Sequence, residues 1–101
     1  MARTVLQFNP QRVYIPSSNT DHELDFGSVL SSDDFNGTIL IDNISAPVRF
    51  NMNGAVDANF SGVYTTTDKP IFDARRSQNA DPVLHYYGAS GTSFQVTILN
   101  A

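Results

Sequence analysis

Apolar and polar side chains alternate along short stretches of this chain, and the clearest stretch spans residues 48–52. One face of that stretch would carry Val48, Phe50 and Met52, and the other would carry Arg49 and Asn51. Because successive residues of a β-strand point to opposite faces, a period of two predicts a strand with one buried and one solvated face. Comparable short runs lie at residues 4–8, 12–15, 22–26, 38–44, 60–66, 69–73, 83–87 and 94–99.

Residues that favour turns separate these runs. Asn36-Gly37 and Asn53-Gly54 are dipeptides that tolerate positive φ, and they predict tight turns. Residues 88–91, Gly-Ala-Ser-Gly, predict another turn, and prolines interrupt the chain at several points. The one segment with room for a short helix is 27–35, where serine residues could cap it.

This rhythm of strands and turns predicts an all-β fold. We expect an antiparallel β-sandwich, or a small jelly-roll-like barrel, of about eight short strands. The composition agrees, because the helix formers Glu and Lys occur once each, at Glu23 and Lys69. We expect one domain over residues 1–101, in which residues 1–18 could form an extended N-terminal arm.

The inward faces can be assigned strand by strand from the same alternation. The side chains expected in the core include Leu24, Phe26, Ile39, Ile41, Val48, Phe50, Met52, Phe94, Val96 and Ile98.

Charge and cysteine content exclude several classes of protein. The formal net charge is −4 and the six cationic side chains are scattered, so we expect no nucleic-acid partner. The chain has no cysteine, which excludes disulfides and thiolate metal sites. The N-terminus lacks the apolar segment of a signal peptide and no run could span a bilayer, so we expect synthesis in the cytoplasm and no membrane partner.

The candidate catalytic and metal-binding residues are weak. His22 lies between Asp21 and Glu23, but in a strand the two carboxylates would face away from the histidine, so we expect an exposed strand of mixed polar residues. Residues 88–91 have one residue too few for a nucleophile elbow around Ser90. We therefore expect no catalytic residues, no metal site and no cofactor, and we do not expect an enzyme.

Four residues form the candidate interface: Arg75, Arg76, Tyr86 and Tyr87. The two tyrosines are adjacent, so one of them must face away from the sheet interior. An exposed tyrosine beside the two arginines would suit a protein or sugar interface. In the sugar-binding alternative, Asn51 and Asn53 would join the tyrosines as contacts.

The second half of the chain resembles small virion structural proteins of tailed bacteriophages. The matching parts are residues 48–54 (VRFNMNG), 61–63 (SGV), 70–72 (PIF) and Gly88 through Ile98. The resemblance implies a β-sandwich that decorates or cements a capsid, and it implies no catalytic residues. It also implies a virion location, the major capsid protein or other virion proteins as partners, and a homo-oligomer, with a trimer favoured.

Two alternatives stay open at this point. The protein could instead be a head–tail connector, neck or tail accessory protein of the virion. It could also be a small carbohydrate-binding β-sandwich module.

Overall fold

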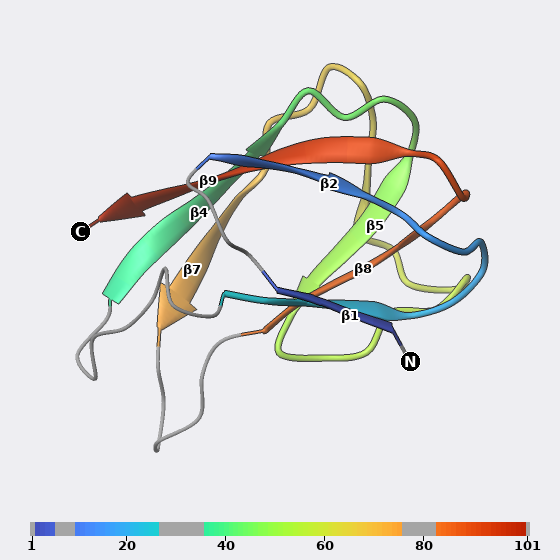
Figure 1. Cartoon of the computed structure of the whole chain (residues 1–101), viewed down its shortest axis with the longest axis horizontal. Helices are drawn as coiled ribbons and strands as arrows, with labels where there is room; N and C mark the ends of the chain where they lie inside the picture. Colours follow the sequence, from blue (N-terminus) through green and yellow to red (C-terminus); the bar gives the residue numbers. More distant parts are fainter. Residues whose placement is uncertain (1, 6–9, 27–35, 76–82, 101) are drawn as a thin grey trace.

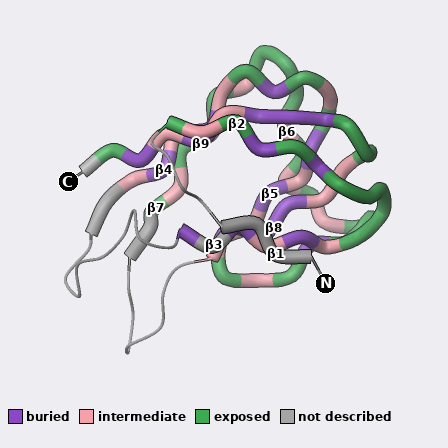
Figure 2. The backbone as a smooth tube through the Cα atoms, viewed as in Figure 1, coloured by how far each residue is buried: buried purple, intermediate pink, exposed green. Residues whose placement is uncertain are grey.

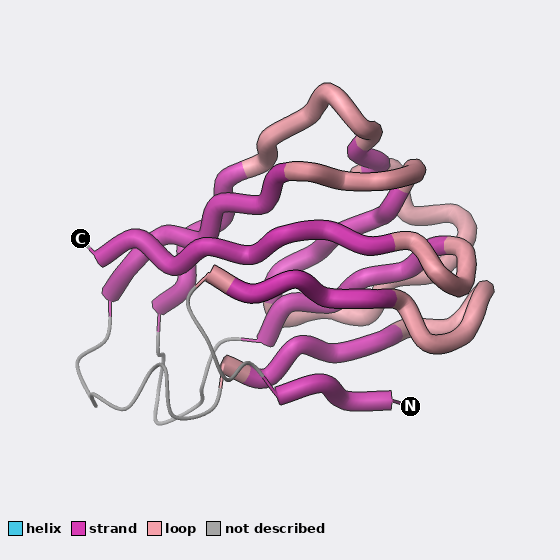
Figure 3. Tube along the Cα trace, turned by 45° about the horizontal axis from the view of Figure 1, so that its top comes forward, coloured by secondary structure: helices cyan, strands magenta, loops and turns pink. Residues whose placement is uncertain are grey.

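The computed structural model describes residues 2–5, 10–26, 36–75 and 83–100, and within them it contains nine strands and no helix (Figures 1 and 3). The strands are β1 (Ala2–Val5), β2 (Gln11–Tyr14), β3 (His22–Asp25), β4 (Asn36–Asp42), β5 (Val48–Met52), β6 (Val63–Tyr64), β7 (Ile71–Arg75), β8 (Val83–Gly88) and β9 (Ser93–Asn100).

The strands form two sheets that lie face to face (Figure 1). Sheet A has the order β1-β3-β8-β5-β6, and sheet B has the order β2-β9-β4-β7. Each sheet ends in two edge strands, so the fold is a sandwich and not a closed barrel. The prediction of a small all-β sandwich is therefore confirmed.

Every strand pair is antiparallel except one. β1 runs parallel to β3, with Ala2 opposite His22 and Val5 opposite Asp25. The chain leaves β1 for β2 in sheet B and then returns to β3 in sheet A. Those two reversals give β3 the direction of β1. Local alternation carries no information about this pairing, and the sequence did not predict it.

The core is built from the inner faces of both sheets (Figure 2). Nine of the side chains that alternation placed inward are buried; they are Leu24, Phe26, Ile39, Ile41, Val48, Phe50, Phe94, Val96 and Ile98. Met52 is only partly buried and packs against this cluster. Each large side chain that is fully buried contributes roughly 1.5–3 kcal/mol, which makes this interior the main source of stability.

Two local predictions were wrong. Asn36 and Gly37 do not turn the chain but begin β4, opposite Arg75 and Ala74. The strand predicted over residues 60–66 is reduced to Val63–Tyr64, because Thr65 and Asp68 close a turn in which the Thr65 amide donates to the Asp68 carboxylate at 2.7 Å.

The tight turn predicted at Asn53-Gly54 is right only in the conformation of Asn53, since Gly54 does not have a positive φ. Asn53 has a φ of 60°, but the chain then crosses a loop before it reaches β6. The possible helix at 27–35 lies outside the described residues.

Candidate interface

The two outer faces of the sandwich differ in chemistry. On sheet A, register places Glu23 and Asn51 on either side of His85, so the middle of this face is polar. On sheet B, the outward residues include several large apolar side chains. The two faces are therefore suited to different partners.

His85 is held by carboxylates from the neighbouring segments. Its Nδ1 lies 3.1 Å from both carboxylate oxygens of Asp21, and its Nε2 lies 3.9 Å from Oε1 of Glu23. Because a carboxylate only accepts, Nδ1–H is the donor to Asp21. Asp21 and Glu23 do share one face, as predicted, but the histidine that they contact is His85.

His22 lies on the opposite face, inside the core, so the prediction of an exposed β3 was wrong. It is fully buried, stacks on Tyr86 with ring centroids 5.4 Å apart, and its Nε2 lies 2.8 Å from the Ser17 carbonyl oxygen. That carbonyl accepts from the ring, so Nε2 carries the proton. The alternation placed His22 opposite Asp21 and Glu23 correctly. It also placed Leu24 and Phe26 in the core, and because these residues share the face of His22, the same pattern indicates that His22 is buried.

The cluster around His85 does not suit a metal ion. The two ring nitrogens point at different carboxylates, so one ion could not bind both of them. Within the described ranges, no group of three His, Cys, Asp or Glu side chains is placed to hold a metal.

Ser90 and His85 do not form a catalytic pair. The Ser90 hydroxyl lies in the turn after β8 and donates to the Pro16 carbonyl at 3.4 Å, whereas the His85 ring contacts Asp21. The turn predicted at 88–91 is present, with the Thr92 amide donating to the Ala89 carbonyl and Gly91 at a φ of 86°.

The loop between β5 and β6 covers part of the outer face of sheet A (Figure 1). Val56 in this loop is only 2% exposed, and its amide donates to Oδ1 of Asp21 at 3.1 Å. Further along, Nε of Arg49 donates to the Phe60 carbonyl at 2.9 Å. These bonds fix the loop on the sheet, so much of this face is already occupied by the chain itself.

The outer face of sheet B, in contrast, presents apolar side chains to solvent. Tyr14 is 63% exposed, Ile71 62% and Leu99 43%. Leu40 lies directly opposite Ile71 in the β4–β7 pair. Of the four large apolar side chains that are most exposed in the described part of the chain, only Val63 belongs to sheet A. We call Leu40, Ile71 and Leu99, together with Tyr14 at the far end of the same face opposite Ser93, the sheet B patch.

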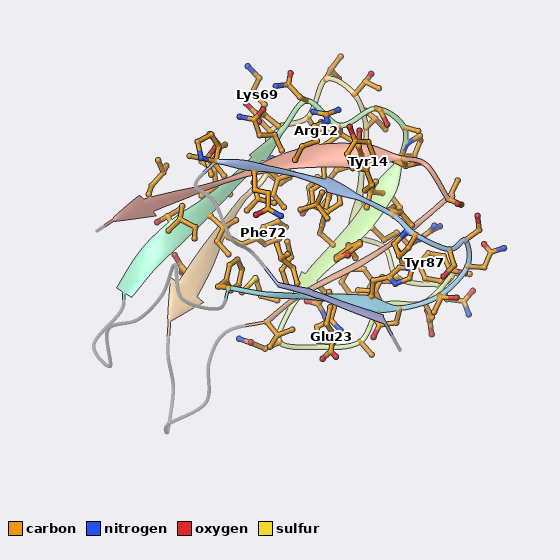
Figure 4. All side chains as sticks on the ribbon, in the orientation of Figure 1. Arg12, Tyr14, Glu23, Lys69, Phe72 and Tyr87 are labelled. Carbon is orange, nitrogen blue, oxygen red and sulfur yellow. The ribbon has the colours of Figure 1, made fainter. Side chains whose placement is uncertain are left out.

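The structure does not bring the three described members of the predicted interface, Arg75, Tyr86 and Tyr87, together. Tyr86 is fully buried against Phe94, with centroids 5.2 Å apart, so its assignment to a surface was wrong. Tyr87 faces outward from sheet A, 6.0 Å from the Arg49 guanidinium carbon. Arg75 ends β7 in sheet B, whereas Tyr87 belongs to β8 of sheet A (Tyr87 is labelled in Figure 4), and Arg76 lies outside the described residues.

The contacts of the sugar-binding alternative are also engaged within the chain. Nδ2 of Asn51 donates to the Gly54 carbonyl at 3.2 Å, and Oδ1 of Asn53 accepts from the Val83 amide at 3.0 Å. Tyr86 is buried, and the Tyr87 hydroxyl donates to Oδ1 of Asn19 at 3.5 Å.

Sequence reasoning missed the residues of the sheet B patch as a group. The sequence indicated one member of the patch, since alternation placed Leu99 on the outer face, opposite to the inner face that carries Ile98. What the sequence lacked was the pairing that brings β2, β9, β4 and β7 into one sheet.

The fold and its surfaces define a small two-sheet β-sandwich in which sheet B exposes Tyr14, Ile71 and Leu99 among polar side chains. In the part of the chain that is described, we find no helix of the length and hydropathy needed to cross a bilayer. No family model, curated protein or solved structure matches this sequence.

Proposed function

We propose that this protein is a structural component of a tailed-bacteriophage virion, a decoration or cement protein that binds across neighbouring capsid subunits. The proposal combines the resemblance of residues 48–98 to small virion proteins with the chemistry of the sandwich surface. The observation that carries it is the sheet B patch, where Tyr14, Ile71 and Leu99 expose apolar surface on one face. Leu40, Ile71 and Leu99 lie within two residue positions of one another along β4, β7 and β9, and exposed apolar side chains that gather in this way favour a protein-binding role.

The mechanism is mechanical. The patch would lie on the shell, while sheet A and its covering loop would face outward. A protein that binds the assembled shell but not free subunits stabilises the shell by mass action. A sandwich with a packed interior transmits load without deforming, which suits this role.

The test is to compare intact virions with virions that lack the protein. We expect the stripped particles to release their genome at a lower temperature, and purified protein to restore the original value. Equal stability of stripped and intact particles would rule out a cement role. A head–tail connector or tail accessory role would use similar surfaces, and a small fixed copy number per particle, measured by mass spectrometry, would identify it.

A variant pair tests the docking face itself. Tyr14→Ser/Leu99→Ser removes exposed apolar surface from sheet B and should abolish rebinding to stripped particles. Val63→Ser removes a side chain of comparable exposure from sheet A and should leave rebinding unchanged. Normal rebinding by the double variant would contradict the assignment of this face.

A further inference from the structure

The free edge of sheet B has a backbone arrangement that can accept another strand. β7 is the last strand in the order β2-β9-β4-β7, and among the described strands it pairs only with β4. The Ile41 amide donates to the Pro70 carbonyl at 3.0 Å, which makes 41 and 70 a hydrogen-bonded pair. Since such pairs alternate along an antiparallel ladder, Ile71 and Asp73 direct their backbone N–H and C=O groups away from β4, onto the open edge.

Pro70 does not interrupt that edge. Its missing N–H belongs to the side that faces β4, where its carbonyl still accepts from Ile41. A proline at the start of an edge strand often blocks pairing. Here Pro70 leaves the backbone N–H and C=O groups of Lys69 and Ile71, which point to the open edge, available for pairing.

The side chains along this edge are self-complementary. Lys69, Ile71 and Asp73 are all exposed and are spaced by two residues, so in extended chain they share one face. Ile71, at 62% exposure, is the centre of this sequence, with a cation two residues before it and an anion two residues after it. In a second, antiparallel strand centred on Ile71, Lys69 and Asp73 therefore exchange positions.

We propose that two copies of this chain pair through β7, antiparallel, about a twofold axis at Ile71. Ile71 of each copy then lies opposite the Ile71 of the other, and Lys69 of each lies opposite Asp73 of the other. Opposite charges and apolar pairs at facing positions stabilise antiparallel strands, whereas like charges destabilise them. Other centres are less favourable; one at Asp73, for example, sets the two Asp73 carboxylates against each other.

This pairing has consequences for the assembly. It joins two copies of sheet B into one continuous eight-stranded sheet and places two sheet B patches side by side. The interface is isologous and closes with two copies, so it departs from the trimer that the resemblance implies. A single strand pair buries less surface than a typical stable dimer, so the dimer is expected to be weak and concentration-dependent. The inference rests on β7 alone and does not depend on the proposed role in the virion.

Sedimentation equilibrium of the purified chain tests the pairing. We expect a reversible monomer–dimer equilibrium that weakens as salt is added, because the charge pairs are exposed. Lys69→Asp and Asp73→Lys each place like charges opposite one another at two positions, so each should weaken dimerisation by at least about tenfold. Ala58→Lys adds an exposed charge in the loop over sheet A and should leave dimerisation unchanged.

Mixing the two single variants gives the sharpest result. A Lys69→Asp copy facing an Asp73→Lys copy restores two attractive pairs, so the mixture should form heterodimers at least as well as the wild-type protein forms homodimers. The double variant Lys69→Asp/Asp73→Lys should likewise recover self-association. If the two charges acted only within one copy of the chain, neither the mixture nor the double variant would recover dimerisation.

A crosslinking experiment checks the register. The chain has no cysteine, so Ile71→Cys introduces a single thiol at the axis. Facing residues of a hydrogen-bonded pair have Cα atoms about 5.5 Å apart, a separation that a disulfide spans. Oxidation should give covalent dimers for Ile71→Cys and not for Asp73→Cys. A monomer at all concentrations, a trimer, or a dimer insensitive to both charge variants would each overturn the proposal.

Discussion

Neighbouring residues in this chain have opposite roles because a strand exposes them to different surroundings. Tyr86 packs between His22 and Phe94 in the core, while Tyr87 faces outward beside Arg49. Two buried polar atoms of the described residues, Nδ1 of His22 and Oδ1 of Asp42, have no hydrogen-bond partner. Such atoms cost stability. The large aromatic interior is therefore needed to offset them.

The two adjacent tyrosines provide a direct comparison. Tyr86→Ala leaves a large cavity between the sheets and should lower the free energy of unfolding by about 3–5 kcal/mol. Tyr87→Ala removes a half-buried ring from the surface and should cost much less, about 1 kcal/mol or below. Urea denaturation of both variants measures the difference. Similar losses for the two would contradict the placement of Tyr86 in the core.

Asp21 connects three segments of the molecule through one carboxylate. It accepts from the His85 ring and from the Val56 amide in the loop over sheet A. Asp21→Ala leaves that buried amide without an acceptor, so it should destabilise the fold by about 1–3 kcal/mol.

Hydrogen exchange locates this effect. In Asp21→Ala the Val56 amide should exchange much faster, because the loop is no longer fixed at that point. Asp57→Ala is the matched control, since Asp57 is exposed and, among the described residues, its carboxylate accepts from the nearby Asn59 amide and not from Val56. If Val56 stays protected in Asp21→Ala, the hydrogen bond to Asp21 does not hold the loop.

Turns decide where each element begins and ends. The connection between β8 and β9 is fixed by bonds between the turn and the end of β2: the Gly91 amide donates to the Ile15 carbonyl at 3.0 Å, and the Ile15 amide donates to the Thr92 carbonyl at 2.8 Å. Gly91 has a φ of 86°, a conformation that side chains with a Cβ rarely adopt. The glycine is needed for backbone conformation and not for space, because no atom lies within 4 Å of an added Cβ.

Substitutions of Gly91 test whether the glycine is needed for its backbone conformation or for lack of space. Gly91→Ala should destabilise the fold by about 1 kcal/mol through backbone strain. Gly91→Asn should cost less, because asparagine tolerates positive φ better than alanine does. Thermal or urea unfolding of the pair gives the order. A neutral alanine variant would show that the turn relaxes to negative φ.

At the scale of the molecule, both sheets contribute to one core. Phe50 of sheet A packs edge-on against Phe94 of sheet B, with ring centroids 4.8 Å apart. Most strand partners are distant in sequence; β2, for example, pairs with β9. Neither sheet can bury its inner face without the other, so the two should fold and unfold together.

We therefore expect a single cooperative unfolding transition. Far-ultraviolet circular dichroism reports the strands and near-ultraviolet signals report the packed tyrosines, and the two curves should coincide. Folding should be slow for a chain of this length, in the range of milliseconds to seconds, because non-local pairs dominate. Two separated transitions would contradict a single domain.

Local alternation determined much of this protein. It gave the strand class, the bounds of β5, and the inward direction of Leu24, Ile39, Phe94 and their counterparts, because a period of two fixes which residues share a face. It also required that Tyr86 and Tyr87 face opposite ways. These properties depend only on neighbours in the sequence.

The tertiary structure decided which strands became neighbours and which side chains met on each outer face. His85 meets Asp21 because β3 pairs with β8, and no local pattern records that pairing. Asn36 and Gly37 begin β4 and do not form a turn, because the partner strands β7 and β9 extend alongside them. The sheet B patch and the open edge at Ile71 exist for the same reason: surfaces form between segments that the sequence separates, and only the folded chain brings them together.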